Sequence, residues 1–318
     1  MARLFLGHSL RAAAVKSRLL QYSLWSLEAG ILGAFWGFCS LLPPDRVVAF
    51  GQWSLSRLGP WLAKHRQVKN NLSLAFPDKT TAQIEALAQA VWGNLGAVLA
   101  EYPHLPKIVN DSTGQWLEID LKTDLQPYRQ GKKAAVFVAA HLGNWELSAA
   151  VAIKLGVPLT VLYAPLTNPL LDRMLWRKRQ LLGCNFLAKE DSMRATVRLL
   201  TRHQSMGFLV DQRVNSGELI PFFGMAASTT SSPARLALKL GCDLIPVQVE
   251  RLQGAHFRVT FHAPLKPDDE QADKATQALQ LTGKLNALFE AWIRQRPQQW
   301  LCTKRRWPKT VTPVSDDR

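Results

Sequence analysis

The chain has few cysteines and no recognisable metal-binding motif. Its four cysteines, Cys39, Cys184, Cys242 and Cys302, are far apart in the 318 residues and form no CxxC pair. This usage argues for a reducing compartment and against a zinc site. The histidines form no HExxH or HxxxH set, so we expect no metal ligands and no metal cofactor.

Three common nucleotide and hydrolase motifs are also missing. No GxGxxG, Walker A or GxSxG pattern is present, which removes the simple dinucleotide, NTPase and α/β-hydrolase interpretations. No internal repeat and no long low-complexity linker occurs either. A chain of 318 residues therefore forms one large domain or a domain with an appendage.

Acidic residues are scarce relative to basic ones. Lys and Arg total 39 against 24 for Asp and Glu, which gives a formal net charge of +15. Such an excess fits three kinds of partner: nucleic acid, an anionic membrane surface, or an acidic protein or phosphorylated substrate.

Residues 1–45 differ from the rest of the chain. Four basic residues form a leader: Arg3, Arg11, Lys16 and Arg18. The segment "SLWSLEAGILGAFWGFCSLLPP" follows, with Glu28 as its one charged residue, and it ends without a small-x-small cleavage site. A cleaved signal peptide is therefore the weaker interpretation.

This apolar segment predicts a membrane-associating helix. Its uninterrupted part, residues 29–42, is shorter than the roughly 20 residues that a membrane span needs. Four tryptophans lie in or near it, in keeping with the membrane interface: Trp25, Trp36, Trp53 and Trp61. The alternative is an amphipathic helix buried in the protein's own core.

Beyond residue 45, helical and strand patterns alternate. Helical spacing covers residues 80–101, 145–155, 168–182, 192–202, 233–240 and 270–294. Strand patterns cover residues 134–140, 159–163, 206–210, 244–250 and 257–261. The alternation predicts an α/β domain over residues 46–310, with a mixed central sheet flanked by helices. Residues 311–318 read as a disordered tail.

The stretch "HLGNWE" joins the expected strand 134–140 to the expected helix 145–155. Asn144 suits the helix N-cap, and the turn would let His141 and Glu146 face each other at the carboxyl end of a strand. A carboxylate can hold an imidazole in one tautomer and stabilise its protonated form, as a general base requires. The alternative is a capped helix after an ordinary polar turn, which spacing alone favours.

A basic helix is expected over residues 168–182. Arg173 and Arg177 are four residues apart and share a helix face, a geometry suited to phosphate or carboxylate groups. A solvated basic face explains the same pattern equally well.

Two later stretches combine polar and aromatic residues. Asp211 follows an apolar strand, so it is expected at the same sheet edge as His141. Phe222 and Phe223 could wall an apolar channel or form a core pair. Residues 294–309, "RQRPQQWLCTKRRWPK", mix basic residues with two tryptophans and could serve RNA, membrane headgroups or a phosphoglycolipid.

Taken together, these motifs resemble a known family. "HLGNWE" is similar to the H-x4-D/E signature of glycerolipid-type acyltransferases, and its form resembles the bacterial lipid A biosynthesis (late) acyltransferases. The resemblance continues in order through "RQVKNNLSLAFP", "YAPLTNPLLDRMLWRKRQLLG", "VDQR…GELIPFFG", "SSPARLALKLGCDLIPV" and "PQQWLCTKRRW". This chain departs at Ala164, where family members often carry arginine, and at Cys302 and Lys304 within the family's "QWLW.HRRW".

The resemblance implies transfer of a lauroyl or myristoyl chain from acyl carrier protein to a hydroxyl of a lipid A precursor. His141 would take the hydroxyl proton, and the oxygen would attack the thioester. Glu146 would orient His141, with Asp211 a second candidate for that role and Asn144 in support. Acyl-ACP is a substrate in this scheme, so no cofactor is required.

The resemblance also implies partners and a location. Arg173 first, and then Arg177, would hold anionic groups of the glycolipid acceptor. The acidic carrier protein and an anionic bilayer both favour a strongly basic protein. Because the carrier protein is cytoplasmic and basic residues flank the apolar segment on both sides, we expect binding at the cytoplasmic face of the inner membrane without a crossing.

Other interpretations stay open. A catalytically inactive membrane-surface protein would share the basic and aromatic features, but it has no need of His141 and Glu146 at a sheet edge. A nucleic-acid binder would use residues 294–309 without explaining the apolar N-terminus, so we expect no nucleic acid partner. Within the enzyme class, the acceptor could be another glycolipid or a lysophospholipid.

Overall fold

The computed structural model describes residues 18–188 and 192–311. The basic residues Arg3, Arg11 and Lys16 of the leader lie outside this part, as does nearly all of the expected tail at 311–318. Arg18 is the first residue of helix α2 (Arg18–Ser40).

A seven-stranded sheet forms the centre of the molecule. Its spatial order is β1 (Leu117–Leu121), β9 (His256–Phe261), β8 (Asp243–Gln253), β2 (Ala135–Ala139), β5 (Ser205–Leu209), β3 (Leu159–Tyr163) and β4 (Asn185–Ala188). Neighbouring strands pair in parallel except β8 and β9, which are antiparallel. The predicted mixed α/β sheet is therefore confirmed. Because β2 and β5 are parallel neighbours, their carboxyl ends meet at one edge.

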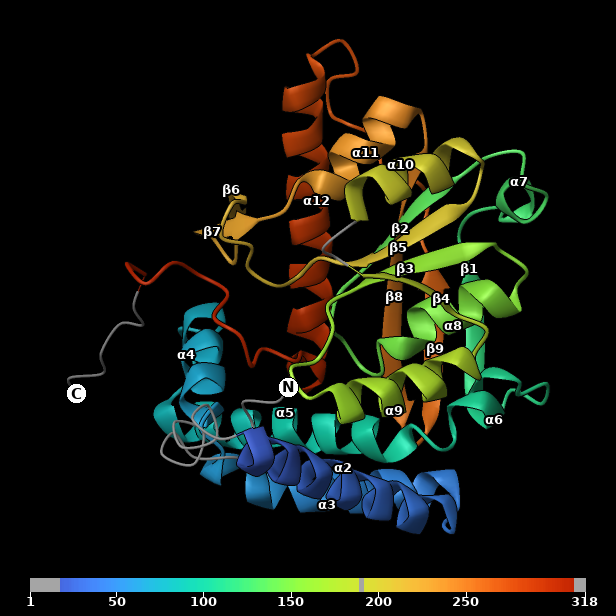
Figure 1. Ribbon diagram of the computed structural model, residues 1–318. Coiled ribbons are helices and arrows are strands. Elements are labelled where there is room, and N and C mark those ends of the chain that lie inside the picture. The colour runs from blue at the N-terminus through green and yellow to red at the C-terminus, as the bar shows by residue number, and fades with distance from the viewer. Residues whose placement is uncertain (1–17, 189–191, 312–318) are drawn as a thin grey trace.

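Helices lie on both faces of this sheet, as Figure 1 shows. The larger ones are α8 (Glu146–Lys154), α9 (Pro169–Gln180), α10 (Ser192–Thr201), α11 (Ser232–Leu240) and α12 (Lys274–Gln295). Helix α8 packs against β3 and β8, whereas α10 and α11 contact β5 and β2 from the other side. Three short helices also occur: α6 (Leu105–Val109), α7 (Gln126–Arg129) and η3 (Pro297–Gln299).

The N-terminal part forms a helical layer below the sheet in Figure 1. Helices α2, α3 (Pro44–Leu58) and α5 (Thr81–Glu101) make up this layer, with η1 (Gly59–Trp61) after α3, and α4 (His65–Ala75) stands upright at its left end in Figure 1. Helices α3 and α5 cross so closely that a Cβ atom on Gly51 would come within 2.4 Å of the Gly96 carbonyl oxygen. Only glycine permits this approach, so the crossing fixes α3 firmly against α5.

Helix α2 packs on α5 and α9 along one of its faces. Trp36 and Cys39 are buried there, and the Trp36 indole donates a hydrogen bond to the Leu99 carbonyl (2.8 Å). Glu28 accepts a hydrogen bond from the Asn168 amide at the start of α9 (2.9 Å). Within residues 18–188 and 192–311, no helix combines the length and hydropathy needed to cross a membrane.

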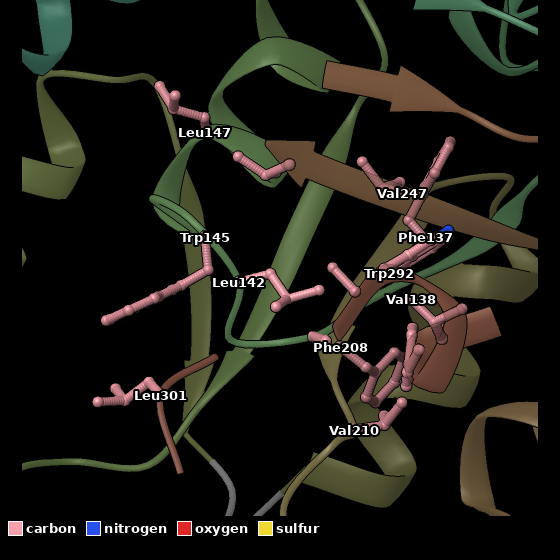
Figure 2. Close-up of a cluster of buried hydrophobic side chains, with 14 of the residues drawn as sticks. Phe137, Val138, Leu142, Trp145, Leu147, Phe208, Val210, Val247, Trp292 and Leu301 are labelled. Carbon is pink, nitrogen blue, oxygen red and sulfur yellow. The ribbon is translucent and has the colours of Figure 1, made fainter. Parts of the chain in front are cut away.

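Apolar side chains pack around the turn between β2 and α8. Figure 2 shows Leu142, Trp145 and Leu147 of this segment beside buried residues of β2, β5 and β8. Phe222 and Phe223, on the hairpin β6 (Glu218–Phe222) and β7 (Met225–Thr229), also belong to the core. Their ring centroids lie within 6.4 Å of those of Trp300 and Trp307. Phe222 and Phe223 therefore form a core pair, and the interpretation that they wall an apolar channel is wrong.

Candidate active site

His141 and Asp211 meet at the carboxyl edge of the sheet. His141 follows β2 and Asp211 follows β5, and the Nδ1 atom of His141 lies 2.6 Å from Oδ1 of Asp211. The second oxygen of Asp211 accepts a hydrogen bond from the Trp300 indole (3.1 Å). Burial opposes ionisation of Asp211, but His141 and Trp300 outweigh it and hold the pKa of this carboxyl below its ordinary value.

The C-terminal segment holds the backbone of His141 in place. The Leu301 amide donates to the His141 carbonyl (2.9 Å), and the Gly143 amide donates to the Gln299 carbonyl (3.2 Å). Gly143 has φ +54°, and a Cβ on it would stand 3.0 Å from the Val249 carbonyl oxygen. Both the conformation and the close contact therefore require glycine at this turn.

Asp211 occupies Nδ1 of His141, so Nε2 is the ring nitrogen left for another partner. The His141 side chain is 16% exposed and lines a cavity, whereas the Asp211 side chain is 1% exposed. The Gln212 amide nitrogen lies 3.3 Å from Nε2. An imidazole with its Nδ1 proton bound by a buried carboxylate can accept a proton at Nε2, which is the geometry of a general base.

Glu146 has partners other than His141. Its carboxylate binds the Arg179 guanidinium through two contacts (2.9 and 2.6 Å) and accepts a hydrogen bond from the Tyr102 hydroxyl (2.8 Å). Burial opposes its ionisation, but Arg179 holds the pKa of Glu146 below its ordinary value. The expected pairing of Glu146 with His141 is therefore absent from the described geometry, and Asp211, the second candidate, is the imidazole's partner.

The Asn144 side chain stabilises the turn between β2 and α8 through two hydrogen bonds. Its side-chain oxygen accepts a hydrogen bond from the Glu146 amide (3.3 Å). Helix α8 begins at Glu146, and Trp145 occupies the N-cap position without a side-chain cap, so the predicted N-cap role of Asn144 is wrong. Its amide nitrogen donates to Glu101 (2.7 Å), which also forms a buried ion pair with Arg251. Asn144 is fully buried, so its contacts are with the protein itself.

A cavity of about 1050 Å³ opens beside His141. Strands β2, β3 and β5 supply much of its apolar lining, including Phe137, Val161, Gly207 and Phe208. Polar and charged residues line it as well, including Lys64, Gln212, Arg213, Ser231 and Lys304. The cavity therefore has both apolar and polar lining residues, with His141 among them.

Arg173 and Arg177 do not line this cavity; both are exposed on α9. The arginine of α9 that reaches the cavity is Arg179. Leu171 and Leu175 are buried, and Arg179 continues their four-residue spacing onto the same face. Helical periodicity would therefore have identified Arg179, whereas the proximity of Arg173 to Arg177 pointed to the solvent face.

Trp300 is a second residue that sequence reasoning missed. Trp300 and Trp307 are each 1% exposed, and buried Arg306 donates to Thr229 (2.8 Å) and stacks on Phe222. Burial lowers the pKa of Arg306 to about 10. The tryptophans of residues 294–309 thus pack in the core, and Trp300 also binds Asp211. They are not available on the surface for RNA or membrane headgroups, as the sequence had suggested.

The chain was compared with known proteins. The family model described as bacterial lipid A biosynthesis acyltransferase matches residues 14–309. The chain is 23% identical over 291 residues to lipid A biosynthesis acyltransferase 1 of Shigella flexneri and to the lipid A biosynthesis myristoyltransferase of Escherichia coli, covering 86% of each chain. It is also 23% identical over 257 residues to a phosphatidylinositol mannoside acyltransferase of Mycolicibacterium smegmatis, covering 79% of this chain and 81% of that protein. A family match over nearly the whole length shows that this chain belongs to the bacterial lipid A biosynthesis acyltransferases.

Proposed function

We propose that this enzyme transfers a fatty acyl chain from acyl carrier protein to a hydroxyl of a lipid A precursor. The observation that carries the proposal is the bond between His141 and buried Asp211 in the wall of a largely apolar cavity of about 1050 Å³. Such a cavity can take an acyl chain, and the imidazole stands where a proton acceptor is needed.

The reaction begins with proton transfer to Nε2 of His141. The acceptor oxygen attacks the thioester carbonyl carbon as its proton moves to the imidazole, and Asp211 stabilises the resulting imidazolium. Collapse of the tetrahedral intermediate breaks the C–S bond, and the leaving sulfur takes the proton from His141. The products are an ester and a free carrier thiol, and the base is regenerated.

Glu146 has a supporting place in this scheme. Its ion pair with Arg179 joins the first turn of α8 to the end of α9, and both residues line the cavity. This pair fixes the cavity wall next to His141. The base and its carboxylate are therefore His141 and Asp211, whereas Glu146 acts through the position of α8.

The acceptor is proposed to be a glycolipid. The relatives are named for lipid A biosynthesis and for a phosphatidylinositol mannoside, so the names agree on acylation and differ in the acceptor. A lipid A precursor is the first candidate because the family model carries that description. Another glycolipid or a lysophospholipid is the alternative. The net charge of +15 favours the acidic carrier protein as the donor's protein part.

We also propose that α2 lies against the cytoplasmic face of the inner membrane. Leu27, Ile31 and Phe38 are exposed and fall within about 40° of one another at 100° per residue, opposite the buried Trp36. An apolar stripe that the protein leaves uncovered suits the lipid interface. Helix α2 also contacts α9, which follows the cavity-lining residues 166–167. The stripe would therefore place the cavity near bilayer-embedded acceptors.

A direct assay tests the transfer. Purified enzyme is incubated with a panel of acyl-ACPs and membranes that contain a lipid A precursor, and the lipid products are weighed by mass spectrometry. We expect one new ester, larger by one acyl chain, and none with His141→Ala. Acylation by His141→Ala at the wild-type rate would contradict the assignment, and an acylated lysophospholipid alone would identify the alternative acceptor.

A further inference from the structure

Three basic side chains in the cavity have no acidic partner in the described part of the chain. They come from separate segments: Lys64 precedes α4, Arg213 follows Asp211 by two residues, and Lys304 lies in the C-terminal segment. No hydrogen bond or ion pair joins these three side chains to residues 18–188 or 192–311. The fold thus brings three unpaired cations to the cavity that contains His141.

The acidic residues of the cavity do not neutralise them. Glu146 is bound to Arg179, and Glu218 is bound to Arg235 through a contact of 2.7 Å. Burial opposes ionisation of Glu218, but Arg235 and Ser231 keep its pKa below the ordinary value. Each of these carboxylates already balances one guanidinium. The cavity therefore retains the positive charge of Lys64, Arg213 and Lys304.

Arg213 is the member of this set that burial marks most clearly. Its Nε atom is buried and has no hydrogen-bond acceptor among the described residues. A buried donor on a charged group is costly to leave unbonded, so such a position favours an incoming acceptor. The planar guanidinium offers paired N–H groups that match two oxygens of a phosphate, a geometry that lysine lacks.

We propose that Arg213, with Lys64 and Lys304, binds a phosphate group of a substrate beside His141. The proposal rests on the acyl-transfer function and adds to it a recognition site for an anion. Two substrates can supply a phosphate: the phosphodiester of the carrier's pantetheine arm, or a phosphate of the glycolipid. Arg173 and Arg177, the sequence-based candidates for this task, lie on the exposed side of α9.

Matched substrate pairs distinguish the two sources. The donor pair is S-acyl-phosphopantetheine and S-acyl-pantetheine, and the acceptor pair is a hydroxyl-bearing glycolipid with and without its phosphate. We expect Arg213→Ala to raise the KM of the phosphate-bearing member of one pair about 10- to 100-fold while changing its phosphate-free partner little. Arg213→Lys should recover part of the loss, because it keeps the charge without the planar fork.

Arg202→Ala is the matched control. Arg202 is an exposed arginine at the end of α10, near the start of β5 and so towards the opposite edge of the sheet. The Arg202→Ala substitution removes the same charge and should leave the KM values of the donor pair and of the acceptor pair unchanged. Equal losses for both members of each pair, or no loss for any member, in a folded Arg213→Ala protein would overturn the phosphate site.

A binding measurement keeps this proposal separate from the reaction. Calorimetric titration with inorganic pyrophosphate at low ionic strength should give heat with wild type and with Arg202→Ala, and a much weaker response with Arg213→Ala. If wild type transfers no acyl chain yet binds pyrophosphate through Arg213, the proposed function fails and the anion site stands. Equal pyrophosphate binding by wild type and Arg213→Ala would remove the anion site even in an active enzyme.

Discussion

Replacing Asp211 by asparagine tests the centre of the proposed mechanism. The two carboxylate oxygens of Asp211 accept from the His141 ring (2.6 Å) and from the Trp300 indole (3.1 Å). An asparagine side chain has one acceptor oxygen and one donor nitrogen. An asparagine at position 211 can therefore accept a hydrogen bond from the His141 ring or from the Trp300 indole, but not from both. Its amide nitrogen then faces the other of these two groups.

Either arrangement impairs the proposed base. If the amide oxygen turns to Trp300, the amide nitrogen faces His141 and favours the tautomer that is protonated on Nε2, which cannot accept the substrate proton. If the oxygen turns to His141, the tautomer is kept but the negative charge that stabilises the imidazolium is lost. We expect kcat to fall about 10²–10⁴-fold with a small change in KM. An unsatisfied N–H also costs about 1–3 kcal/mol of folding free energy.

Initial rates of acyl transfer at saturating lipid give kcat, and circular dichroism with thermal unfolding reports the fold. Asp78→Asn is the control, since Asp78 is exposed and the change in charge is the same. A folded Asp211→Asn enzyme that keeps kcat within about threefold of wild type would refute the role of this carboxylate, because a base that needs its partner cannot lose so little.

Three further changes test the remaining parts of the proposal. His141→Ala should abolish ester formation in a folded protein and should also lower the melting temperature, because it leaves the buried Asp211 carboxylate without the ring that it binds. Glu146→Ala should lower the free energy of unfolding by about 1–3 kcal/mol in denaturant titrations, because it leaves the half-buried Arg179 guanidinium without its carboxylate partner. The pKa of Glu146 is lowered in the folded protein, so this difference should be complete at neutral pH and shrink as the pH falls through that lowered value. Leu27→Glu should reduce cosedimentation with anionic vesicles, whereas Leu219→Glu, at another exposed leucine on β6, should not; equal binding by both variants would reject the α2 stripe.

The sequence predicted the inner strands because each carries a short run rich in apolar residues, and β2 is buried along its whole length. Strand β2 reads as a continuous apolar run and β3 was placed at its observed bounds. The strands that were missed lie at the sheet edges or in the hairpin: β1, "LEIDL", is partly exposed, and β4 has four residues. An edge strand has fewer neighbours, so its apolar pattern is short and mixed with polar residues.

The sequence predicted which residues form the site better than it predicted the contacts between them. His141 and Asp211 were both expected at one sheet edge, but 70 positions separate them in the sequence. Their contact depends on β2 and β5 being neighbours, and local periodicity does not fix strand order. The same limit hid Trp300, whose bond to Asp211 depends on how the C-terminal segment returns to the β2 edge.

The spacing of His141 and Glu146 suggested a catalytic pair, but the motif that contains them also forms the turn between β2 and α8. Gly143 supplies the φ of +54° that lets the chain leave β2 and enter α8. Asn144 ties that turn to Glu101 on α5, and Glu146 ties the first turn of α8 to Arg179 on α9. His141 is then the member of "HLGNWE" whose ring nitrogen faces the cavity with a carboxylate behind it. A histidine and a glutamate thus stand between two apolar segments for different reasons: the glutamate joins α8 to α9 through Arg179, and the histidine pairs with Asp211, as the proposed base requires.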